Sequence, residues 1–338
     1  MNQPLGVGII GCGAVSVNHF KALKQLTDAK LVAVCDIDDE HLQKAVETYG
    51  VTGYKDYHDL LADERVDSVH IVTPHYLHAQ MTIDALMAGK HVLCEKPMAI
   101  HAADAERMAE TARETGKVLT VCFQNRYNAA SVKIRQVLDS GVLGAVTGGS
   151  AVVTWDRGEK YYASADWRGK WATEGGGVLI NQAIHTFDLL RWFAGADIVD
   201  LRCSMSAKRL DEVIEVEDTV DMLLTSSSGA RFVFYASNCS VGNTPISMIV
   251  KCEKGELRLN GNVLTIKGPD GETTEDYTSG VAYGKDYWGS GHGFLIEDFY
   301  RCLCEGKPFS IQPEDALKTT ILTDKAYTQA WPQRRREE

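Results

Sequence analysis

The chain has 338 residues, of which 44% are hydrophobic and 24% are charged, and its formal net charge is −11. The length predicts about two domains with large hydrophobic cores, and the composition is ordinary for a globular protein. The negative charge argues against nucleic acid or an anionic membrane surface as a partner, and no apolar run approaches the ~20 residues of a membrane span.

The cysteines and the start of the chain bear on its location. Nine cysteines are scattered without a C-x-x-C pair, and several lie inside apolar stretches, so we expect reduced, buried thiols. Met1–Pro4 lead directly into a strand, from which we expect no signal peptide and a cytoplasmic protein. No residues have metal-ligand spacing, and we expect no metal site.

Residues 1–123 alternate short apolar strands with helices. Strands are expected at 5–10, 31–35, 68–72, 91–94 and 118–123, and helices after residue 15 and at 39–49, 57–61, 76–88 and 102–115. Near-continuous apolar strands between helices predict a parallel sheet covered on both faces. This part is therefore expected to be an α/β Rossmann domain that binds a nucleotide.

The pattern changes after about residue 125. Strands are expected at 145–155, 198–207, 218–225, 230–239, 246–252 and 256–267, and helices at 131–139, 178–193, 292–305 and 313–329. This predicts an α+β domain over residues 124–310, with a large, open, mostly antiparallel or mixed β-sheet. Residues 311–338 are expected to hold a C-terminal helix that packs back on the N-terminal domain.

A glycine turn follows the first expected strand and opens the first helix. It runs from Gly11 to Ser16 with the pattern G-x-G-x-x-S. Gly11 permits a tight turn, and Gly13 lets the backbone approach a pyrophosphate at the positive end of the helix. Ser16 replaces the third glycine of the full pattern and is small enough for close packing. A glycine turn in another kind of α/β protein remains the alternative.

An acidic residue completes this dinucleotide pattern. Asp36 follows the second strand, where a carboxylate accepts hydrogen bonds from the adenosine ribose hydroxyls and repels a 2′-phosphate. Ile37 and Asp38 come next, so no cation stands there for that phosphate. The sequence therefore predicts NAD rather than NADP.

A charged tripeptide, Glu95-Lys96-Pro97, ends the strand 91–94. A lysine at this place lies where a doubly wound sheet opens its ligand crevice. Proline restricts both its own φ and the residue before it, so the Lys96–Pro97 bond is a candidate for the cis form. Thr73-Pro74-His75 closes the preceding strand near the expected nicotinamide, or serves only to end that strand.

A second chemical motif follows three glycines, Gly175-Gly176-Gly177. Asn181 and His185 are four residues apart and share a face of the expected helix 178–193. Asp188, three residues after His185, either orients the imidazole or caps a local group. Glycines before a helix allow the chain to pass close to another molecule. The alternative is a histidine that is simply satisfied within the core.

Three further segments supply candidate substrate contacts. Arg126 and Tyr127 lie at the crossover between the domains, where Arg126 either holds a substrate anion or forms a structural ion pair. Trp167 and Arg168 lie in a loop, where such residues bind sugars or contact another subunit. His292 begins a helix and either faces the same site or belongs to the core.

Together these motifs resemble one family. G-x-G-x-x-S, T-P-x-x-x-H (Thr73–His78), E-K-P and G-G-G-x-x-x-N-x-x-x-H (Gly175–His185) occur in the order and spacing of the Gfo/Idh/MocA family, named after glucose-fructose oxidoreductase and inositol dehydrogenase. The resemblance covers essentially the whole chain. It implies oxidation or reduction of a secondary carbinol with tightly bound NAD(P), with the lysine and the histidine flanking the reacting carbon.

The resemblance also assigns roles to residues. It implies that His185 takes the hydroxyl proton and that Lys96 stabilises the alkoxide, although some members are argued to use the lysine as the proton acceptor. The expected catalytic residues are Lys96, His185 and Asn181. The expected cofactor-binding residues are Gly11, Gly13, Ala14, Val15, Asp36, Thr73, Pro74, His78, Glu95, Lys96 and Gln124. The expected substrate-binding residues are Arg126, Tyr127, Trp167, Arg168, Asn181, His185 and His292.

One departure bears on the substrate. Members similar to inositol dehydrogenase carry Asp where this chain has Asn181, whereas the form found here resembles members that act on aminosugar nucleotides or on glycosides at C3. We therefore expect an NAD-dependent dehydrogenase of a secondary hydroxyl, at C3, of a sugar or sugar derivative. By analogy with relatives, the open sheet is expected to bury against another subunit in a homodimer or homotetramer.

Two alternative functions remain open. One is an NAD-dependent glycosidase or lyase that oxidises C3 only transiently and retains its cofactor, because it would use the same residues. The other is a non-catalytic NAD-binding sensor, which would need neither Lys96 nor His185.

Overall fold

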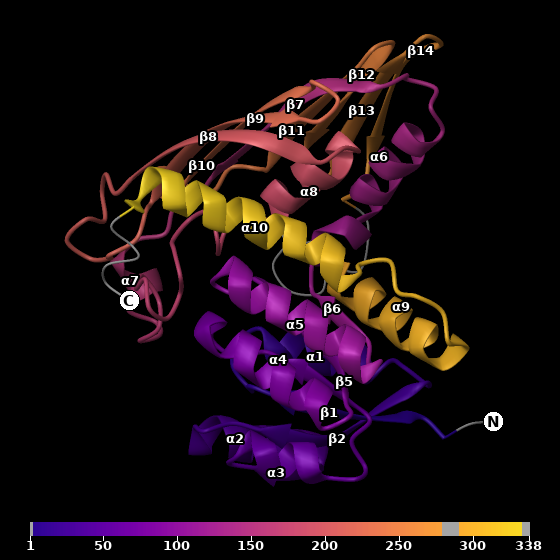
Figure 1. Ribbon diagram of the computed structural model, residues 1–338, viewed down its shortest axis with the longest axis vertical. Helices are drawn as coiled ribbons and strands as arrows, with labels where there is room; N and C mark the ends of the chain where they lie inside the picture. The colour runs from indigo at the N-terminus through magenta and orange to yellow at the C-terminus, as the bar shows by residue number, and fades with distance from the viewer. Residues whose placement is uncertain (1–2, 279–290, 333–338) are drawn as a thin grey trace. The chain divides into compact units, whose positions relative to one another are not determined.

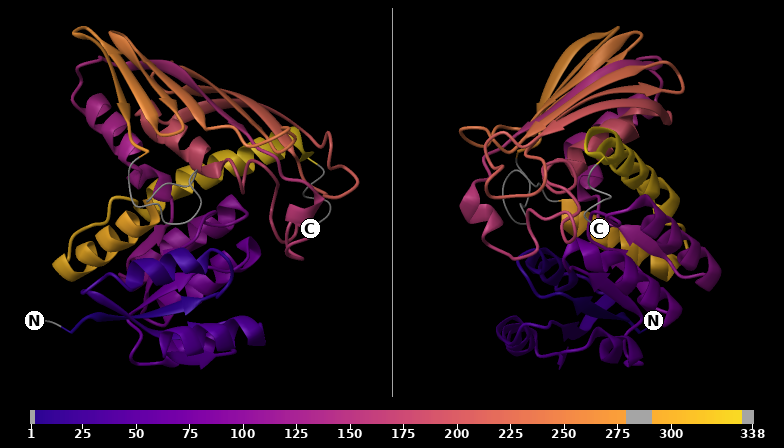
Figure 2. Two further views of the ribbon diagram at one scale, coloured as in Figure 1. Left: turned by 180° about the vertical axis from the view of Figure 1, so that it is seen from behind. Right: turned by 60° about the vertical axis from the view of Figure 1, so that its left-hand side comes forward.

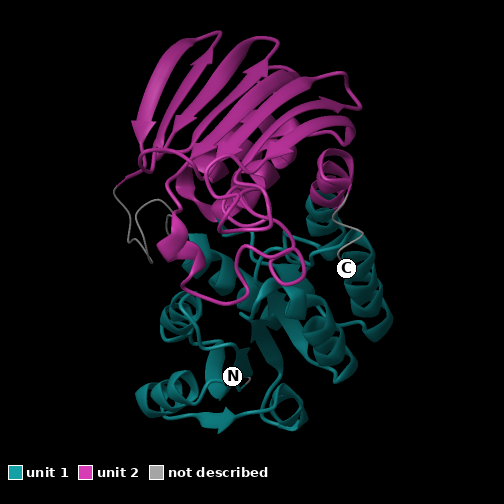
Figure 3. Ribbon diagram, turned by 90° about the vertical axis from the view of Figure 1, so that its left-hand side faces the viewer, with its two compact units in different colours: residues 1–124, 290–320 teal, residues 125–289, 321–338 magenta. Residues whose placement is uncertain are grey.

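The computed structural model describes residues 3–278 and 291–332. The chain forms two compact units, shown in Figure 3. Unit 1 comprises residues 1–124 and 290–320, and unit 2 comprises residues 125–289 and 321–338. Residues 290–310, which the sequence analysis grouped with the second domain, cluster with unit 1.

Unit 1 is built on a six-stranded parallel sheet in the order β3-β2-β1-β4-β5-β6. Figure 1 labels β1, β2, β5 and β6 of this sheet. Its strands are β1 (Leu5–Ile10), β2 (Ala29–Cys35), β3 (Thr52–Tyr54), β4 (Ser68–Ile71), β5 (His91–Cys94) and β6 (Leu119–Val121). Its helices are α1 (Ser16–Leu23), α2 (Asp39–Tyr49), α3 (Tyr57–Ala62), η1 (His75–Leu77), α4 (His78–Met87), α5 (Ala102–Thr115) and α9 (Gly291–Glu305). The Rossmann fold expected from the sequence is confirmed.

Local chemistry explains the boundaries of these elements. The Asp38 carboxylate accepts the N–H of His41 and caps α2, and Gly50 ends that helix with φ +65°. Gly116 ends α5 in the same way. The strand order reverses between β1 and β4, which opens the crevice of a doubly wound sheet beyond their carboxyl ends. The glycine turn, Asp36, Thr73 and Glu95 all follow strands at this edge.

Unit 2 is built on an eight-stranded sheet in the order β14-β13-β12-β11-β7-β10-β9-β8. Its strands are β7 (Val146–Thr154), β8 (Ile198–Ser206), β9 (Thr219–Ser226), β10 (Arg231–Ser237), β11 (Ser247–Cys252), β12 (Gly255–Asn260), β13 (Val263–Gly268) and β14 (Gly271–Asp276). Neighbouring strands are antiparallel except for β7 and β10, which are parallel, so the expected mixed sheet is confirmed. The views in Figure 2 show its twist.

Helices α6 (Ala129–Asp139), α7 (Glu159–Tyr162) and α8 (Ile184–Ala194) belong to unit 2, and α8 packs against β7 and β11. Helix α10 (Pro313–Ala330) begins in unit 1 and ends in unit 2, and the 3₁₀ turn η2 (Gln124–Tyr127) also crosses the boundary. Burial alternates along β9 and β10, so that one face of the sheet is buried and the other is exposed.

Two expectations need correction. The helix expected at 178–193 begins only at Ile184, because residues 178–183 form turns whose N–H groups have other partners. The stretch 256–267 is a hairpin of β12 and β13 that turns at Gly261, with φ +59°. No helix among residues 3–278 and 291–332 is long and apolar enough to cross a membrane.

Candidate active site

The dinucleotide turn has the geometry that its glycines predict. Gly11 adopts φ +97°, and a Cβ there would lie 2.4 Å from the carbonyl oxygen of Val72. A Cβ on Gly13 would meet nothing within 4 Å, so the backbone is open at this point. The Ser16 hydroxyl donates to the carbonyl oxygen of Gly13 at 2.6 Å and stabilises the turn where α1 begins.

Asp36 is tied to this turn by its own side chain. Its Oδ2 accepts the N–H of Cys12 at 2.7 Å, and its Oδ1 accepts the N–H of Asp38 at 2.8 Å. Each carboxylate oxygen can accept a second hydrogen bond, so both remain available to a ribose. The sequence analysis missed a nearby cation: Lys55 Nζ donates to the Ile37 carbonyl oxygen at 2.7 Å. Lys55 follows β3, a strand too short for its pattern to be predicted.

One residue of the E-K-P turn is only partly buried. Lys96 is the only residue between Val92 and Ile100 that is not buried. The Lys96–Pro97 peptide bond is cis, as expected. The turn therefore presents a lysine from otherwise buried backbone at the carboxyl end of β5.

His78 connects the T-P-x-x-x-H motif with the E-K-P motif. Its ring is fully buried, with Nδ1 2.7 Å from the Pro97 carbonyl oxygen and Nε2 2.9 Å from the Thr73 carbonyl oxygen. Burial lowers the pKa of His78, and the two backbone contacts oppose this shift. Its observed contacts thus hold two turns together.

Glu95 has internal partners on both carboxylate oxygens. Oε1 lies 3.0 Å from His19 Nε2 and 3.3 Å from His292 Nε2, and Oε2 accepts the backbone N–H of Lys96 at 3.2 Å. Burial alone raises the pKa of Glu95, but hydrogen bonds from His19 and His292 hold it well below the ordinary carboxyl value. His292, expected near the substrate, is 3% exposed and faces Glu95.

In unit 2, the second and third glycines of the run pass close to other residues of the same unit. A Cβ on Gly176 would lie 2.1 Å from the Tyr327 hydroxyl oxygen, and one on Gly177 would lie 1.9 Å from the Glu217 carbonyl oxygen. We expected these glycines to leave room for another molecule. The structure gives them an internal packing role.

Glu217 and Tyr327 hold the turn that precedes α8. The fully buried Glu217 carboxylate accepts the N–H groups of Gly177 at 2.8 Å and Leu179 at 2.9 Å. The Tyr327 hydroxyl donates to Glu217 at 2.8 Å and accepts the N–H of Ile180 at 3.2 Å. These bonds explain why the helix starts later than the sequence pattern predicts.

His185 lies in the first turn of α8 and is the only residue between Glu174 and Arg191 that is not buried. Asn181 lies on the preceding turn, and its amide donates to the Glu174 carboxylate and to the Tyr161 hydroxyl, the latter at 3.1 Å. Glu174 is fully buried and was not singled out from the sequence. Its spacing of seven residues before Asn181 carries no recognisable signal.

The Tyr161 hydroxyl is a hub of polar contacts. It accepts hydrogen bonds from Arg168, Asn181 and Gln182, and the Arg168 guanidinium also lies over the Tyr161 and Trp167 rings, at 4.4 and 4.6 Å from their centroids. The expected substrate residues Trp167 and Arg168 are therefore brought together with Asn181. Tyr161, on the one-turn helix α7, and Gln182, in the turn before α8, were missed.

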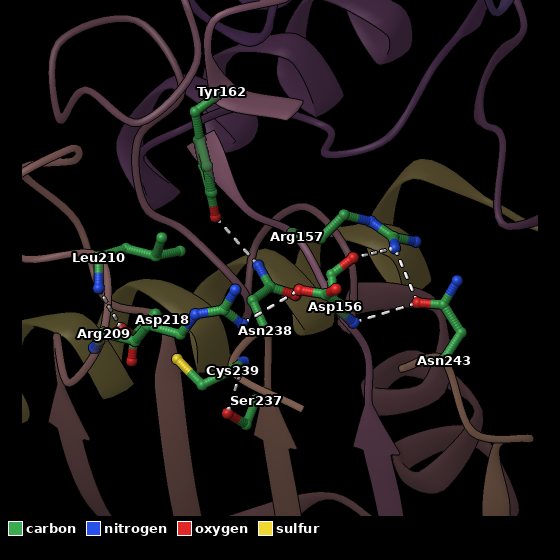
Figure 4. Close-up of polar contacts among 10 residues, drawn as sticks. All are labelled: Asp156, Arg157, Tyr162, Arg209, Leu210, Asp218, Ser237, Asn238, Cys239 and Asn243. Carbon is green, nitrogen blue, oxygen red and sulfur yellow. Dashed lines mark hydrogen bonds and ion pairs between the residues drawn. The ribbon is translucent and has the colours of Figure 1, made fainter. Parts of the chain in front are cut away.

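Gln182 links this hub to the end of the sheet. Its Oε1 accepts from Asn238 Nδ2 at 3.0 Å. Asn238 also donates to the Tyr162 hydroxyl at 3.0 Å, and Figure 4 shows this second bond. In the same view, Asp156 and Arg157 both bond to Asn243. The loops around Asn181 are thus connected by hydrogen bonds to the polar residues that follow β7 and β10.

Arg126 forms a buried ion pair. Its Nε and Nη2 each donate to the Asp188 carboxylate at 2.7 Å, and its guanidinium lies 5.3 Å from the centre of the Trp192 ring. This forked pairing ties η2 to α8 within unit 2. Tyr127 is partly exposed beside it, and Gln124 is buried in unit 1.

Comparisons with known proteins agree with this geometry. Residues 5–123 match the model of an oxidoreductase family with an NAD-binding Rossmann fold, and residues 131–258 match the Gfo/Idh/MocA C-terminal domain. The chain is also 30% identical over 260 residues to an inositol 2-dehydrogenase of Salmonella typhimurium, which covers 75% of this chain and 74% of that protein. The chain belongs to the Gfo/Idh/MocA oxidoreductase family. It is accordingly a dehydrogenase that acts on CH–OH groups, as the sequence predicted.

Two other family members match nearly the whole chain. The myo-inositol 2-dehydrogenase of Thermotoga maritima is 28% identical over 324 residues, covering 94% of this chain and 93% of that one. The crystal structure of the WlbA dehydrogenase from Bordetella pertussis, in complex with NADH and UDP-GlcNAcA, is 30% identical with a TM-score of 0.84. That match covers 97% of this chain and 96% of the other.

Proposed function

We propose that this enzyme oxidises a secondary hydroxyl, at C3, of a sugar or sugar derivative, with NAD as the hydride acceptor. One observation carries the proposal. Lys96 and His185 are each partly exposed, and all the other residues of the segments 92–100 and 174–191 around them are buried. A structural lysine or histidine in such a segment would be expected to be covered like its neighbours.

The cofactor part of the proposal rests on unit 1. The turn at Gly11 and Gly13 would receive the pyrophosphate, and Asp36 would accept the adenosine ribose hydroxyls. The carboxylate disfavours a 2′-phosphate, although Lys55 lies near the end of β2. That lysine forms an ion pair with Asp39 at 2.6 Å, so we propose NAD over NADP. The WlbA dehydrogenase, a relative, is described with NADH.

The catalytic part assigns separate tasks to two side chains. Bound NAD would supply the acceptor for the hydride. His185 would take the hydroxyl proton, because imidazole has a reference pKa of about 6.5 and suits proton transfer at neutral pH. Lys96 would donate a hydrogen bond to the same oxygen and stabilise the developing negative charge. Asn181, held by Glu174, would position the substrate.

The substrate class rests on the polar groups of unit 2. Trp167, Tyr161 and Arg168 offer ring faces and donors of the kind that bind sugar rings and anions. One relative is named for inositol, and another, the WlbA dehydrogenase, is described in complex with UDP-GlcNAcA. Members similar to inositol dehydrogenase carry Asp where this chain has the neutral amide of Asn181. We therefore favour a glycoside or sugar nucleotide over free inositol.

The proposal is tested by a spectrophotometric screen. Purified enzyme with NAD would be offered inositols, free sugars, glycosides and UDP-aminosugars, with NADH absorbance followed and products identified by mass spectrometry. We expect NADH with a sugar derivative, and a fall in kcat of about 100-fold or more in Lys96→Met. Exposed Lys24→Met, at the end of α1, is the control. Release of an aglycone without net NADH would instead identify the glycosidase or lyase.

We further propose a homodimer or homotetramer formed through the exposed face of the unit 2 sheet, in a cytoplasmic protein. Val152, Leu223, Val233 and Tyr235 are 37–54% exposed on that face. The strand register places Val233 opposite Leu223 and Tyr235 opposite Val152, so these side chains form one apolar patch. Such a patch on a sheet is typical of a subunit interface.

A further inference from the structure

A chain of buried polar side chains runs from the E-K-P turn into the interior of unit 1. Beyond Glu95, His19 Nδ1 lies 3.0 Å from His70 Nδ1, and His70 Nε2 lies 2.9 Å from the Tyr300 hydroxyl oxygen. The Tyr300 oxygen lies 3.3 Å from Ser68 Oγ. His19, His70, Tyr300 and Ser68 are all 0% exposed. The chain thus joins α1, β4, the E-K-P turn and α9.

Counting protons along this chain leaves one arrangement. An ionised carboxylate only accepts, so His19 donates to Glu95 from Nε2. Burial lowers the pKa of His19 and lowers that of His70 further, so both rings are neutral and carry one N–H each. His19 Nδ1 must therefore accept from His70 Nδ1. His70 Nε2 is then left as an acceptor facing the Tyr300 hydroxyl, whose oxygen also lies 3.3 Å from Ser68 Oγ.

This arrangement has a consequence for the partly buried Lys96. Glu95 Oε2 accepts the backbone N–H of Lys96, while Oε1 is hydrogen-bonded from α1 by His19 and lies 3.3 Å from His292 Nε2 on α9. A carboxylate fixed on both sides in this way defines where residue 96 leaves the strand. Other titratable groups around it include the thiols of Cys94 and Cys122 and the ring of His78.

We propose that Glu95 is a positioning residue for Lys96, and that its carboxylate is fixed by His19, through this chain of donors, and by the adjacent ring of His292. Only the kinetic part of this inference rests on the proposed function. His19, Glu95 and His292 also have the composition of a metal site. The count above assigns the protons of His19 and Glu95 without an ion.

The first test determines which ring nitrogens of His19 and His70 carry protons. Long-range proton–nitrogen NMR of the imidazoles should show His19 as the Nε2–H tautomer and His70 as the Nδ1–H tautomer, both neutral at about pH 6 and about pH 8. His19→Asn and His70→Asn would assign the signals. A charged ring, the opposite tautomers, or one equivalent of zinc that is lost in Glu95→Gln would overturn the proposal.

The second test reads the position of Lys96. In Glu95→Gln the Lys96 amide should lose its protection from hydrogen exchange, and kcat should fall by about 100-fold while the Kd for NAD changes less than about threefold. Exposed Glu106→Gln on α5 is the matched control. His292→Asn serves if Glu95→Gln does not fold. An amide that stays protected in a folded variant would refute the positioning role, whether or not the enzyme oxidises sugars.

Discussion

Two buried glutamates show how neighbours decide the charge of a carboxyl group. Imidazoles of His19 and His292 hold the pKa of Glu95 well below its ordinary value. At Glu217 burial dominates and raises the pKa to about 7, although Leu179, Gly177 and Tyr327 donate to it. Glu95 is therefore a fixed anion, whereas Glu217 changes charge near neutral pH. Residue type alone predicts neither outcome.

Cofactor preference is decided at one residue. Replacing Asp36 by Ser removes the carboxylate that disfavours a 2′-phosphate and leaves Lys55 nearby. The ratio of kcat/KM for NADP to that for NAD should rise at least about tenfold, measured with one substrate under both cofactors. Asp104→Ser on α5 should leave the ratio unchanged. An equal ratio in both variants would contradict the role given to Asp36.

At the scale of elements, the sequence predicts what depends on local pattern. Strand β5 and helix α5 occur at the expected residues, because an apolar run and a terminal glycine define them. The start of α8 was not predictable, since Glu217 and Tyr327 are distant in sequence from the N–H groups they bind. The same holds for the site: Lys96 and His185 stand in motifs, whereas Glu174 and His19 gain their roles only through folding.

The glycine run before α8 allows a stability test of one turn. In Gly176→Ala the added Cβ would meet the Tyr327 ring, and the residue would have to keep φ +154°. The free energy of unfolding should fall by about 3 kcal/mol, measured by urea denaturation. Gly242→Ala, where a Cβ meets nothing within 4 Å, should change it by less than about 0.5 kcal/mol. Similar losses in both variants would disprove the close-packing explanation.

At the scale of the whole molecule, the two units differ in their buried ionisable groups. Burial lowers the pKa of His19, His70 and His78, all in unit 1, whereas the raised pKa of Glu217 belongs to unit 2. The units also differ in their optical probes. The described tryptophans all lie in unit 2, at positions 155, 167, 171, 192 and 331, and the sequence of unit 1 contains none.

These differences predict opposite responses to acid. Below the unfolded histidine pKa of 6.5, the unfolded chain binds protons that native unit 1 does not bind. Each histidine therefore lowers the free energy of unfolding by up to about 1.4 kcal/mol for each pH unit of acidification. Glu217 contributes stability below pH 4.5 that is lost as the pH rises through about 7. Moving from about pH 7.5 to about pH 5.5 should lower the circular-dichroism melting temperature more than the tryptophan-fluorescence one. Equal shifts of the melting temperature by both probes would be evidence against opposite responses of the two units to acid.

Assembly is also a property of the whole molecule. Val233→Glu places a charge in the middle of the apolar patch on the unit 2 sheet, where Val233 is 54% exposed in the single chain. We expect the mass in solution to fall toward that of one chain, measured by light scattering after gel filtration. Val241→Glu, on a fully exposed side chain outside the strands, should keep the mass of the wild type. An unchanged mass for Val233→Glu would place the interface elsewhere.

Unit 1 is discontinuous in sequence, and this affects how the protein is made. During translation, residues 1–124 leave the ribosome well before α9, which supplies His292 and Tyr300. Until then, Glu95 and His70 each lack one partner in a buried setting. The nascent nucleotide-binding sheet therefore lacks its full set of buried partners until α9 has been synthesised. We expect a fragment that ends near residue 124 to depend on chaperones rather than to fold as an independent domain.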